Sequence, residues 1–310
     1  MNGQKAAILL LAHGSPDSPA DVPEFMRYIT GGRPVPDSVI QEVAHRYSLI
    51  GKSPLTAITL EQAEGLRNKL GIPVYVGMRN WRPFIANAVK QMMADGVEQV
   101  IAICLAPQNS STSVGLYRKA LMAELKPGIG VQFVESWHDH PLLVQAFAER
   151  LEPVWRQAGD EVGAPVPVIF TAHSVPMRTI QAGDPYEKQT KETARLVGAK
   201  VSMLGQELQH FAFQSQGMSG GPWLGPTVES AMLELKRQGH AGVVIAPIGF
   251  VCDHVEVLYD IDIGFREFAN EQGLRIWRPE SLNASPTFIA ALAKVATTEL
   301  ARAAGIVSLT

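Results

Sequence analysis

Residues 168–176 read Val-Ile-Phe-Thr-Ala-His-Ser-Val-Pro, an apolar run that stops at a histidine followed by a small residue. Short apolar runs with β-branched residues are typical of strands buried on both faces of a parallel sheet. His173 would then lie at the carboxyl end of a strand, where open α/β sheets bind their ligands. An imidazole at that edge is suited to chemistry, although a hydrogen-bonded structural histidine in a loop is the plainer alternative.

The same design occurs near the start of the chain, where residues 7–16 read Ala-Ile-Leu-Leu-Leu-Ala-His-Gly-Ser-Pro. The repeat continues in residues 96–107 and 239–247, which each run from a glycine through an apolar stretch to Ala-Pro. Alternating strands and helices of this length predict doubly wound parallel sheets. We therefore expect an α/β protein with two similar Rossmann-like domains, residues 1–160 and 161–310, that face each other across a cleft, with the last helix packing back across one of them.

The composition is that of a globular protein, with 310 residues, 46% of them hydrophobic, and a formal net charge of −3. Nucleic acid is not an expected partner, because proteins that bind it carry a concentrated basic excess. No apolar run approaches the roughly 20 residues that span a bilayer, and the first residues do not resemble a signal peptide. We expect a cytoplasmic protein without stable membrane insertion. Cys104 and Cys252 lie far apart, which indicates neither a disulfide framework nor a zinc or iron–sulfur site.

An acidic stretch follows the second Ala-Pro, and on a helix its Glu256 and Asp260 would lie one above the other. Two like charges at this spacing are either tolerated on a solvent-exposed face or retained because they bind a cation transiently. In a doubly wound sheet this stretch begins at the same edge as His173. His173 and Glu256 could then bind a divalent metal loosely and accept protons. A closed structural site needs about four ligands, so transient handling of a metal fits better than storage.

A polar run follows the apolar stretch that ends at Pro107, where residues 108–113 all carry hydroxyl or amide side chains. Such a run at a strand end can bind a polar ligand, cap the helix that follows, or do both. Tyr117 would lie in the first turns of that helix, near the same edge.

Several motifs, taken in order, resemble the ferrochelatase family. They are Leu11–Pro16, Arg46-Tyr47, Ser53–Leu55, Leu105–Pro107, Ala172–Pro176, Gly183–Tyr186, Gln214-Ser215, Trp223–Pro226 and Gly249–Asp260. Each motif alone is weak, but together they are specific, and the likeness extends from about residue 6 to about residue 300. Because membrane-contacting and cluster-binding additions are missing, the chain is most similar to the bacterial enzymes that insert iron into coproporphyrin III.

The resemblance implies a chelatase-type fold and a lyase that inserts Fe²⁺ into a porphyrin during haem synthesis, with the macrocycle bent in the cleft. It implies that His173 and Glu256 are the catalytic residues and metal ligands, and that Asp260 continues an acidic path. We also expect a monomer that needs no cofactor beyond its substrate iron and no iron–sulfur cluster. Its partners would be the porphyrin, ferrous iron and the haem-pathway enzymes before and after it.

The resemblance further implies a set of porphyrin-binding residues, which would hold the macrocycle and its propionates. They are His13, Arg46, Tyr47, Ser53 and Tyr117. A guanidinium offers paired donors to a carboxylate, which suits Arg46 to this role. His13 would lie on the opposite face of the macrocycle from His173 and would be axial to the product iron.

Three positions depart from the family pattern. Relatives that act on coproporphyrin often have tyrosine where this chain has His13, although imidazole is also a competent iron ligand. Gly264 replaces an acidic residue that some relatives carry, and Asn80 stands where certain relatives place a histidine. An auxiliary metal site built from those two positions is therefore not expected.

Two other functions remain open at this point. The first is a related chelatase for sirohydrochlorin or a cobalt corrinoid precursor, but such enzymes usually carry a pair of active-site histidines where this chain has His173 and Glu256. The second is a haem carrier, in which His13 would be the haem ligand. A carrier would not need the acidic stretch, and it would bind haem more tightly than the metal-free porphyrin.

Overall fold

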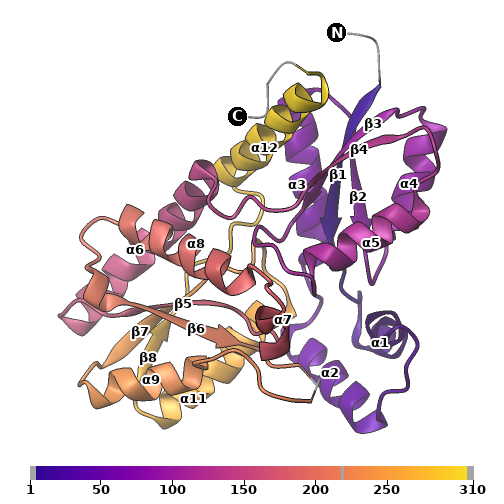
Figure 1. Ribbon diagram of the computed structural model, residues 1–310. Helices are drawn as coiled ribbons and strands as arrows, with labels where there is room; N and C mark the ends of the chain where they lie inside the picture. The colour runs from indigo at the N-terminus through magenta and orange to yellow at the C-terminus, as the bar shows by residue number, and fades with distance from the viewer. Residues whose placement is uncertain (1–4, 218–219, 306–310) are drawn as a thin grey trace. The chain divides into compact units, whose positions relative to one another are not determined.

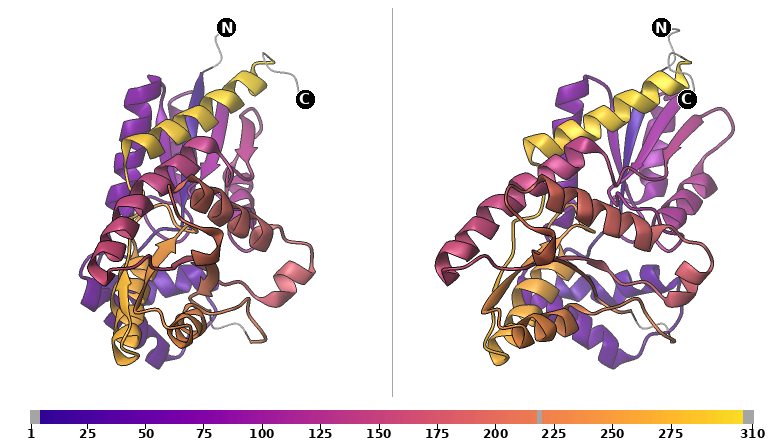
Figure 2. Two further views of the ribbon diagram at one scale, coloured as in Figure 1. Left: turned by 90° about the vertical axis from the view of Figure 1, so that its left-hand side faces the viewer. Right: turned by 60° about the vertical axis from the view of Figure 1, so that its left-hand side comes forward.

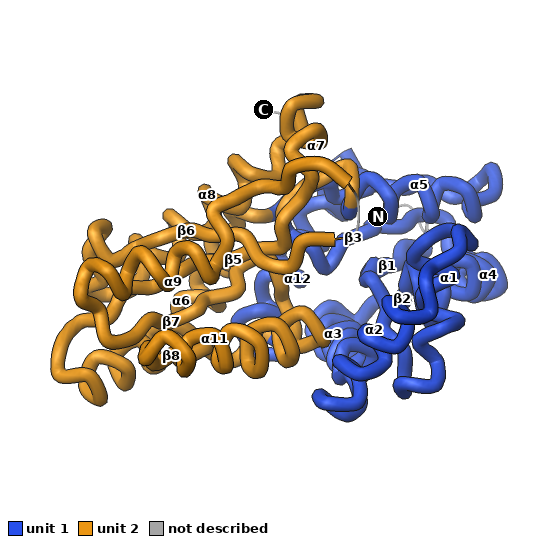
Figure 3. The backbone as a smooth tube through the Cα atoms, turned by 90° about the horizontal axis from the view of Figure 1, so that it is seen from below, with its two compact units in different colours: residues 1–107, 113–137, 283–310 blue, residues 108–112, 138–282 orange. Residues whose placement is uncertain are grey.

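The computed structural model describes residues 5–217 and 220–305, which form two compact units, each built on a four-stranded parallel sheet (Figure 1). Figure 3 colours the two units separately. The first unit takes its described residues from the ranges 1–107, 113–137 and 283–310, and the second takes them from 108–112 and 138–282. None of the described helices combines the length and the apolar composition that crossing a bilayer requires.

The first sheet has the strand order β2-β1-β3-β4. Its strands are β1 (Ala6–Ala12), β2 (Val74–Met78), β3 (Gln99–Cys104) and β4 (Gly130–Val134). The helices of this unit are α1 (Val22–Thr30), α2 (Asp37–Ile50), α3 (Leu55–Leu70), α4 (Ile85–Ala94), α5 (Val114–Glu124) and α12 (Pro286–Ala303), and η1 (Pro19–Asp21) is a 3₁₀ turn.

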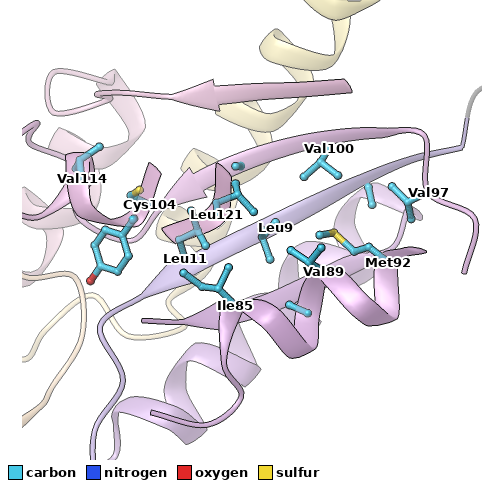
Figure 4. Packing of buried hydrophobic residues seen from close by; sticks show 14 residues of the cluster. Leu9, Leu11, Ile85, Val89, Met92, Val97, Val100, Cys104, Val114 and Leu121 are labelled. Carbon is cyan, nitrogen blue, oxygen red and sulfur yellow. The ribbon is translucent and has the colours of Figure 1, made fainter. Parts of the chain in front are cut away.

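Helices cover both faces of the first sheet because side chains alternate along its strands. Leu9 and Leu11 of β1 pack with Val89 of α4 and Leu121 of α5 in one core, which Figure 4 shows from close by. On the other face α3 packs against β2, and α12 packs against β3 and β4. A strand buried on both faces must be apolar throughout, which explains the unbroken apolar run of β1.

The second sheet repeats this topology with the strand order β6-β5-β7-β8. Its strands are β5 (Val168–His173), β6 (Gln209–Gln214), β7 (Gly242–Pro247) and β8 (Arg275–Trp277). The helices of this unit are α6 (Pro141–Val162), α7 (Met177–Gln181), α8 (Tyr186–Lys200), α9 (Val228–Arg237), α10 (Val255–Leu258) and α11 (Arg266–Glu271), with a 3₁₀ turn η2 (Gln206–Leu208) and a π-helix η3 (Asp260–Phe265). The prediction of two similar doubly wound parallel sheets is confirmed.

The division of the chain differs from the one expected at residue 160. Helix α6 belongs to the second unit, because it packs against α8 and β7. Helix α12, yellow in both views of Figure 2, belongs to the first unit, because it packs against α3 and lies along β3 and β4. The expected boundary at residue 160 lies inside α6, which continues to Val162.

Candidate active site

The candidate catalytic residue of the second unit lies where the strand order of its sheet reverses. β5 is flanked by β6 and β7, and its last residue is His173. Such a reversal point is where doubly wound sheets bind ligands. The Nδ1 atom of His173 bonds to the carbonyl oxygen of Ser174. Because a carbonyl only accepts, Nδ1 carries the proton, and in the neutral ring Nε2 carries the lone pair.

Glu256 lies beside that lone pair. Its Oε1 atom is 3.8 Å from Nε2 of His173, and its Oε2 atom is 3.6 Å from Nε2 of His254. Both distances are longer than that of a normal hydrogen bond, and the carboxylate lies close to both rings. About a third of each of the side chains of His173 and Glu256 is exposed, which leaves them open to a substrate. The predicted pair of His173 and Glu256 is therefore brought together in the structure.

His254 is a residue of this cluster that the sequence analysis did not identify. Its Nδ1 atom donates to the carbonyl of Cys252 at 3.0 Å, and its ring stacks edge-on against Phe250 at 4.7 Å. Burial lowers the pKa of His254, but the nearby Glu256 carboxylate, the Cys252 carbonyl and Asp260 outweigh burial, so the net pKa is raised. The signal in the sequence was a histidine two residues before the candidate glutamate.

The end of β6 positions both acidic residues. Gln214, which is buried, donates its amide to the backbone carbonyl of Glu256 at 2.8 Å. The neighbouring Ser215 donates its hydroxyl to Asp260, and its φ of +59° is a left-handed conformation that non-glycine residues rarely adopt. Such strain is retained mainly at functional sites. Gln214 and Ser215 belong to the quoted motifs, but the sequence alone did not assign them this role.

The acidic stretch does not form one regular α-helix. Helix α10 ends at Leu258, and the π-helix η3 begins at Asp260. Arg278 holds both ends of this segment, because it makes two bonds of 2.7 Å to Asp262 and one of 3.2 Å to Asp253. Asp253 also accepts the hydroxyl of Ser281 at 2.8 Å. These contacts fix the backbone that carries Glu256 and give Asp253 a structural role.

Gly249 allows the loop after β7 to approach His173. A Cβ atom at Gly249 would lie 2.6 Å from Cβ and 2.9 Å from Cα of Ala172, closer than packed atoms come. We expect Gly249→Ala to displace the end of β5, to lower the free energy of unfolding by about 1–3 kcal/mol, and to slow the reaction. Urea unfolding and the rate of the metal insertion that the resemblance implies measure the two effects.

Gly264→Ala is the matched control for this prediction. A Cβ atom at Gly264 meets only the Tyr259 carbonyl, at 3.7 Å, which is an ordinary contact. The urea concentration at the midpoint of unfolding should equal that of the wild type or be slightly higher, because alanine lowers the conformational entropy of the unfolded chain. A Gly249→Ala protein with wild-type stability and rate would show that the close approach does not position His173.

The first unit contains a second copy of the histidine arrangement. His13 follows β1, which is flanked by β2 and β3, so it also lies at the point where strand order reverses. Its Nδ1 atom bonds to the carbonyl of Gly14 at 3.0 Å, as His173 bonds to the carbonyl of its own next residue. Its Nε2 atom meets the side-chain amide nitrogen of Asn80 at 2.9 Å. The repeated sequence thus produces a repeated hydrogen bond.

Aromatic side chains link His13 to Tyr47. Phe25 of α1 lies edge-on to both rings, with centroids 6.0 Å from His13 and 6.4 Å from Tyr47. Tyr47 is buried on α2, and its hydroxyl is 3.0 Å from the hydroxyl of Ser15. Two of the predicted porphyrin-binding residues therefore belong to one packed group.

Tyr117 of α5 is joined to the same edge by Arg79, which directly follows β2. The Arg79 guanidinium lies over the Tyr117 ring, 5.8 Å from its centroid. The buried Nε of Arg79 makes no hydrogen bond within the described residues. Arg79 was not singled out from the sequence, although its position as a polar residue at a strand end was a usable signal.

Arg46 lies in the second half of α2, and Ser53 follows the end of that helix. The Nε of Arg46 is paired with Glu42 at 3.0 Å, and its side chain is 40% exposed. Ser53 is buried, and its hydroxyl makes no hydrogen bond within the part of the chain that the structure describes. An unsatisfied buried hydroxyl is costly, so Ser53 is suited to receive a polar group from a ligand.

Residues 108–112 of the polar run belong to the second unit and form hydrogen bonds within it. Ser111 donates both its backbone N–H and its hydroxyl to Asp184 at 2.7 Å. Ser113 is the N-cap residue of α5, but its side chain makes no capping hydrogen bond. No group of three or more His, Cys, Asp or Glu side chains is arranged to hold a metal ion within residues 5–217 and 220–305.

Comparison with known proteins places this geometry in a family. The family model described as Ferrochelatase matches residues 5–300. A protein of Acidobacterium capsulatum named ferrochelatase is 54% identical, with 96% of each chain covered. A protein of a Geobacillus species named coproporphyrin III ferrochelatase is 36% identical, over 95% of this chain and 98% of that protein. The sirohydrochlorin chelatase SirB of Bacillus subtilis superimposes with a TM-score of 0.60 over 96% of this chain and 97% of its own, at 12% identity, which shows a shared fold.

Proposed function

Because the chain belongs to the ferrochelatase family, we propose that its porphyrin substrate is coproporphyrin III and that its product is coproheme. The chain is a porphyrin metal chelatase, a lyase that inserts iron into a porphyrin during haem synthesis. The observation that carries the proposed site is the lone pair of His173 Nε2, held 3.8 Å from a carboxylate oxygen of Glu256 where the strand order reverses.

Iron insertion requires the pyrrole N–H groups to lose protons and the hydrated Fe²⁺ ion to shed water. In the proposed mechanism, Nε2 of His173 accepts a pyrrole proton or contacts the incoming ion, because its proton is held on Nδ1. Glu256 supplies a negative charge that stabilises either the ion or the protonated imidazole. Asp260 lies four residues further along the chain, at the start of η3, and would receive protons or pass on iron.

The first unit supplies the proposed porphyrin-binding residues. His13 and Tyr47 are joined through Phe25, and Tyr117 is covered by Arg79. The unsatisfied hydroxyl of Ser53 and the unsatisfied Nε of Arg79 support the binding of carboxylates. Coproporphyrin III bears propionates where protoporphyrin IX bears vinyl groups, so these donors favour coproporphyrin III. Relatives that carry the name coproporphyrin III ferrochelatase lend further support.

The test measures loss of porphyrin fluorescence with Fe²⁺ under anaerobic, reducing conditions. We expect kcat/KM for coproporphyrin III to exceed that for protoporphyrin IX by at least about tenfold, the worth of one hydrogen bond to a charged group. A preference for protoporphyrin IX would overturn the choice of substrate. Tight haem binding without metallation of either porphyrin would overturn iron insertion and indicate a carrier.

A further inference from the structure

We propose that Asn80 is a positioning residue that competes with product iron for His13 and thereby sets how fast the metallated porphyrin is released. The side-chain amide of Asn80 is hydrogen-bonded to Nε2 of His13, and iron can bind that nitrogen only after this hydrogen bond breaks. The inference rests on the proposed function, because it takes His13 to be the residue that meets the product iron.

The hydrogen bonds of His13 fix its tautomer. The Gly14 carbonyl can only accept, so Nδ1 of His13 donates to it across 3.0 Å. In the neutral ring, Nε2 then has a lone pair and accepts from the Asn80 side-chain amide at 2.9 Å. A backbone carbonyl on Nδ1 is also the usual partner of a histidine that binds metal through Nε2. His13 is therefore prepared for iron, but its ligating lone pair is already occupied.

Asn80 is held firmly in this position. The residue is 1% exposed, and its backbone N–H donates to the carbonyl of His13 at 2.9 Å. The preceding Arg79 N–H donates to the carbonyl of Ala12 at 3.0 Å. The next residue, Trp81, packs closely on Gly14. A Cβ atom added to Gly14 would lie 2.7 Å from the backbone nitrogen of Trp81. The segment that follows β1 and the segment that follows β2 are thus held together on both sides of Asn80, which restricts the movement of its side-chain amide.

The comparison with His173 shows what the amide changes. Both histidines bond through Nδ1 to the carbonyl of the next residue. The Nε2 of His173 faces a carboxylate, which cannot donate and leaves the lone pair available to a proton or a cation. The Nε2 of His13 faces a donor instead. The same local structure therefore has two uses. At His173 it leaves Nε2 available for metal entry, and at His13 it makes the contact with the product iron weaker and easier to break.

The expected effect equals the net value of one hydrogen bond. Asn80→Leu keeps the size of the side chain but removes the donor, so iron meets His13 without a competitor. We expect ferric coproporphyrin III to bind roughly five- to tenfold more tightly and to leave correspondingly more slowly. Its absorption spectrum should shift toward an imidazole-ligated form.

Asn80→Asp should act in the opposite direction. The aspartate can only accept, so it favours a proton on Nε2 of His13 and hinders ligation. The spectrum of the bound product should then approach that of His13→Ala. Asn87→Asp, which makes the same change of charge on the exposed face of α4, should leave the product spectrum unchanged.

The experiment titrates ferric coproporphyrin III into each variant, records its absorption, and measures its release to an excess of apo-globin. The Asn80→Leu change is then repeated in His13→Ala, where its effect on release should vanish if Asn80 acts through His13. If the wild type metallates porphyrin and both Asn80 variants show the wild-type product spectrum and release rate, this inference is overturned and the proposed function is not. Absence of metallation in the wild type would instead overturn the proposed function.

Discussion

His173→Ala is expected to fold and to bind coproporphyrin III as the wild type does, but to insert iron at least about a hundredfold more slowly. The substitution removes the nitrogen that faces Glu256 across 3.8 Å. His173 is the last residue of β5 and its side chain is 32% exposed, so its truncation leaves no cavity in the core of the sheet. Fluorescence quenching measures porphyrin binding, and stopped-flow absorption measures metallation.

His240→Ala provides the matched control. His240 precedes β7, at the opposite end of the strands from His173, so its loss should leave the rate of metallation unchanged. A His173→Ala enzyme that keeps more than about a tenth of the wild-type rate would show that this strand end is not the catalytic centre.

Glu256→Gln is expected to slow iron insertion by about a hundredfold while leaving porphyrin affinity unchanged, because it removes a charge without changing the size of the side chain. The carboxylate lies between two imidazoles, within 3.8 Å of His173 and 3.6 Å of His254. Its neutralisation should also lower the pKa of His254, which the carboxylate raises. Steady-state kinetics, together with NMR titration of the histidines, tests both effects.

Asp260→Asn should be milder, with a loss of less than about tenfold. The asparagine oxygen can still accept the hydroxyl of Ser215, so the local structure is retained. Glu267→Gln on the exposed part of α11 controls for the change in net charge. If the Glu256 and Asp260 variants both inserted iron at the rate of this control, the acidic stretch would be an ordinary solvent-exposed face without a role in catalysis.

Most of the fold could be predicted because its strands are buried on both faces. β1 and β7 are apolar from end to end, and β5 is apolar apart from Thr171 and its last residue, His173, so the lengths of these strands can be predicted from where each apolar run begins and stops. The elements that escaped prediction are short. α7 has five residues and β8 has three, too few to establish a period, so their form depends on packing against neighbours.

The π-helix η3 escaped prediction for a different reason. Its residues have ordinary helical spacing, and the irregular turn becomes visible only in the bond from the Gly264 N–H to the Tyr259 carbonyl at 2.9 Å. Arg278 fastens this segment from beyond β8, and a contact between residues so far apart has no local signature in the sequence.

The sequence by itself determined where the candidate site residues lie: histidines at two strand ends, and a glutamate after a third, follow from where apolar runs stop. Only the tertiary structure decided how those side chains are held. Asn80 reaches His13, and Ser215 reaches Asp260, because β2 pairs with β1 and because β6 ends beside the acidic stretch. The physical reason is that the pattern of apolar residues along a strand is a local property of the sequence. A hydrogen bond between residues that are distant in the sequence depends instead on which strands pair with each other in the folded sheet.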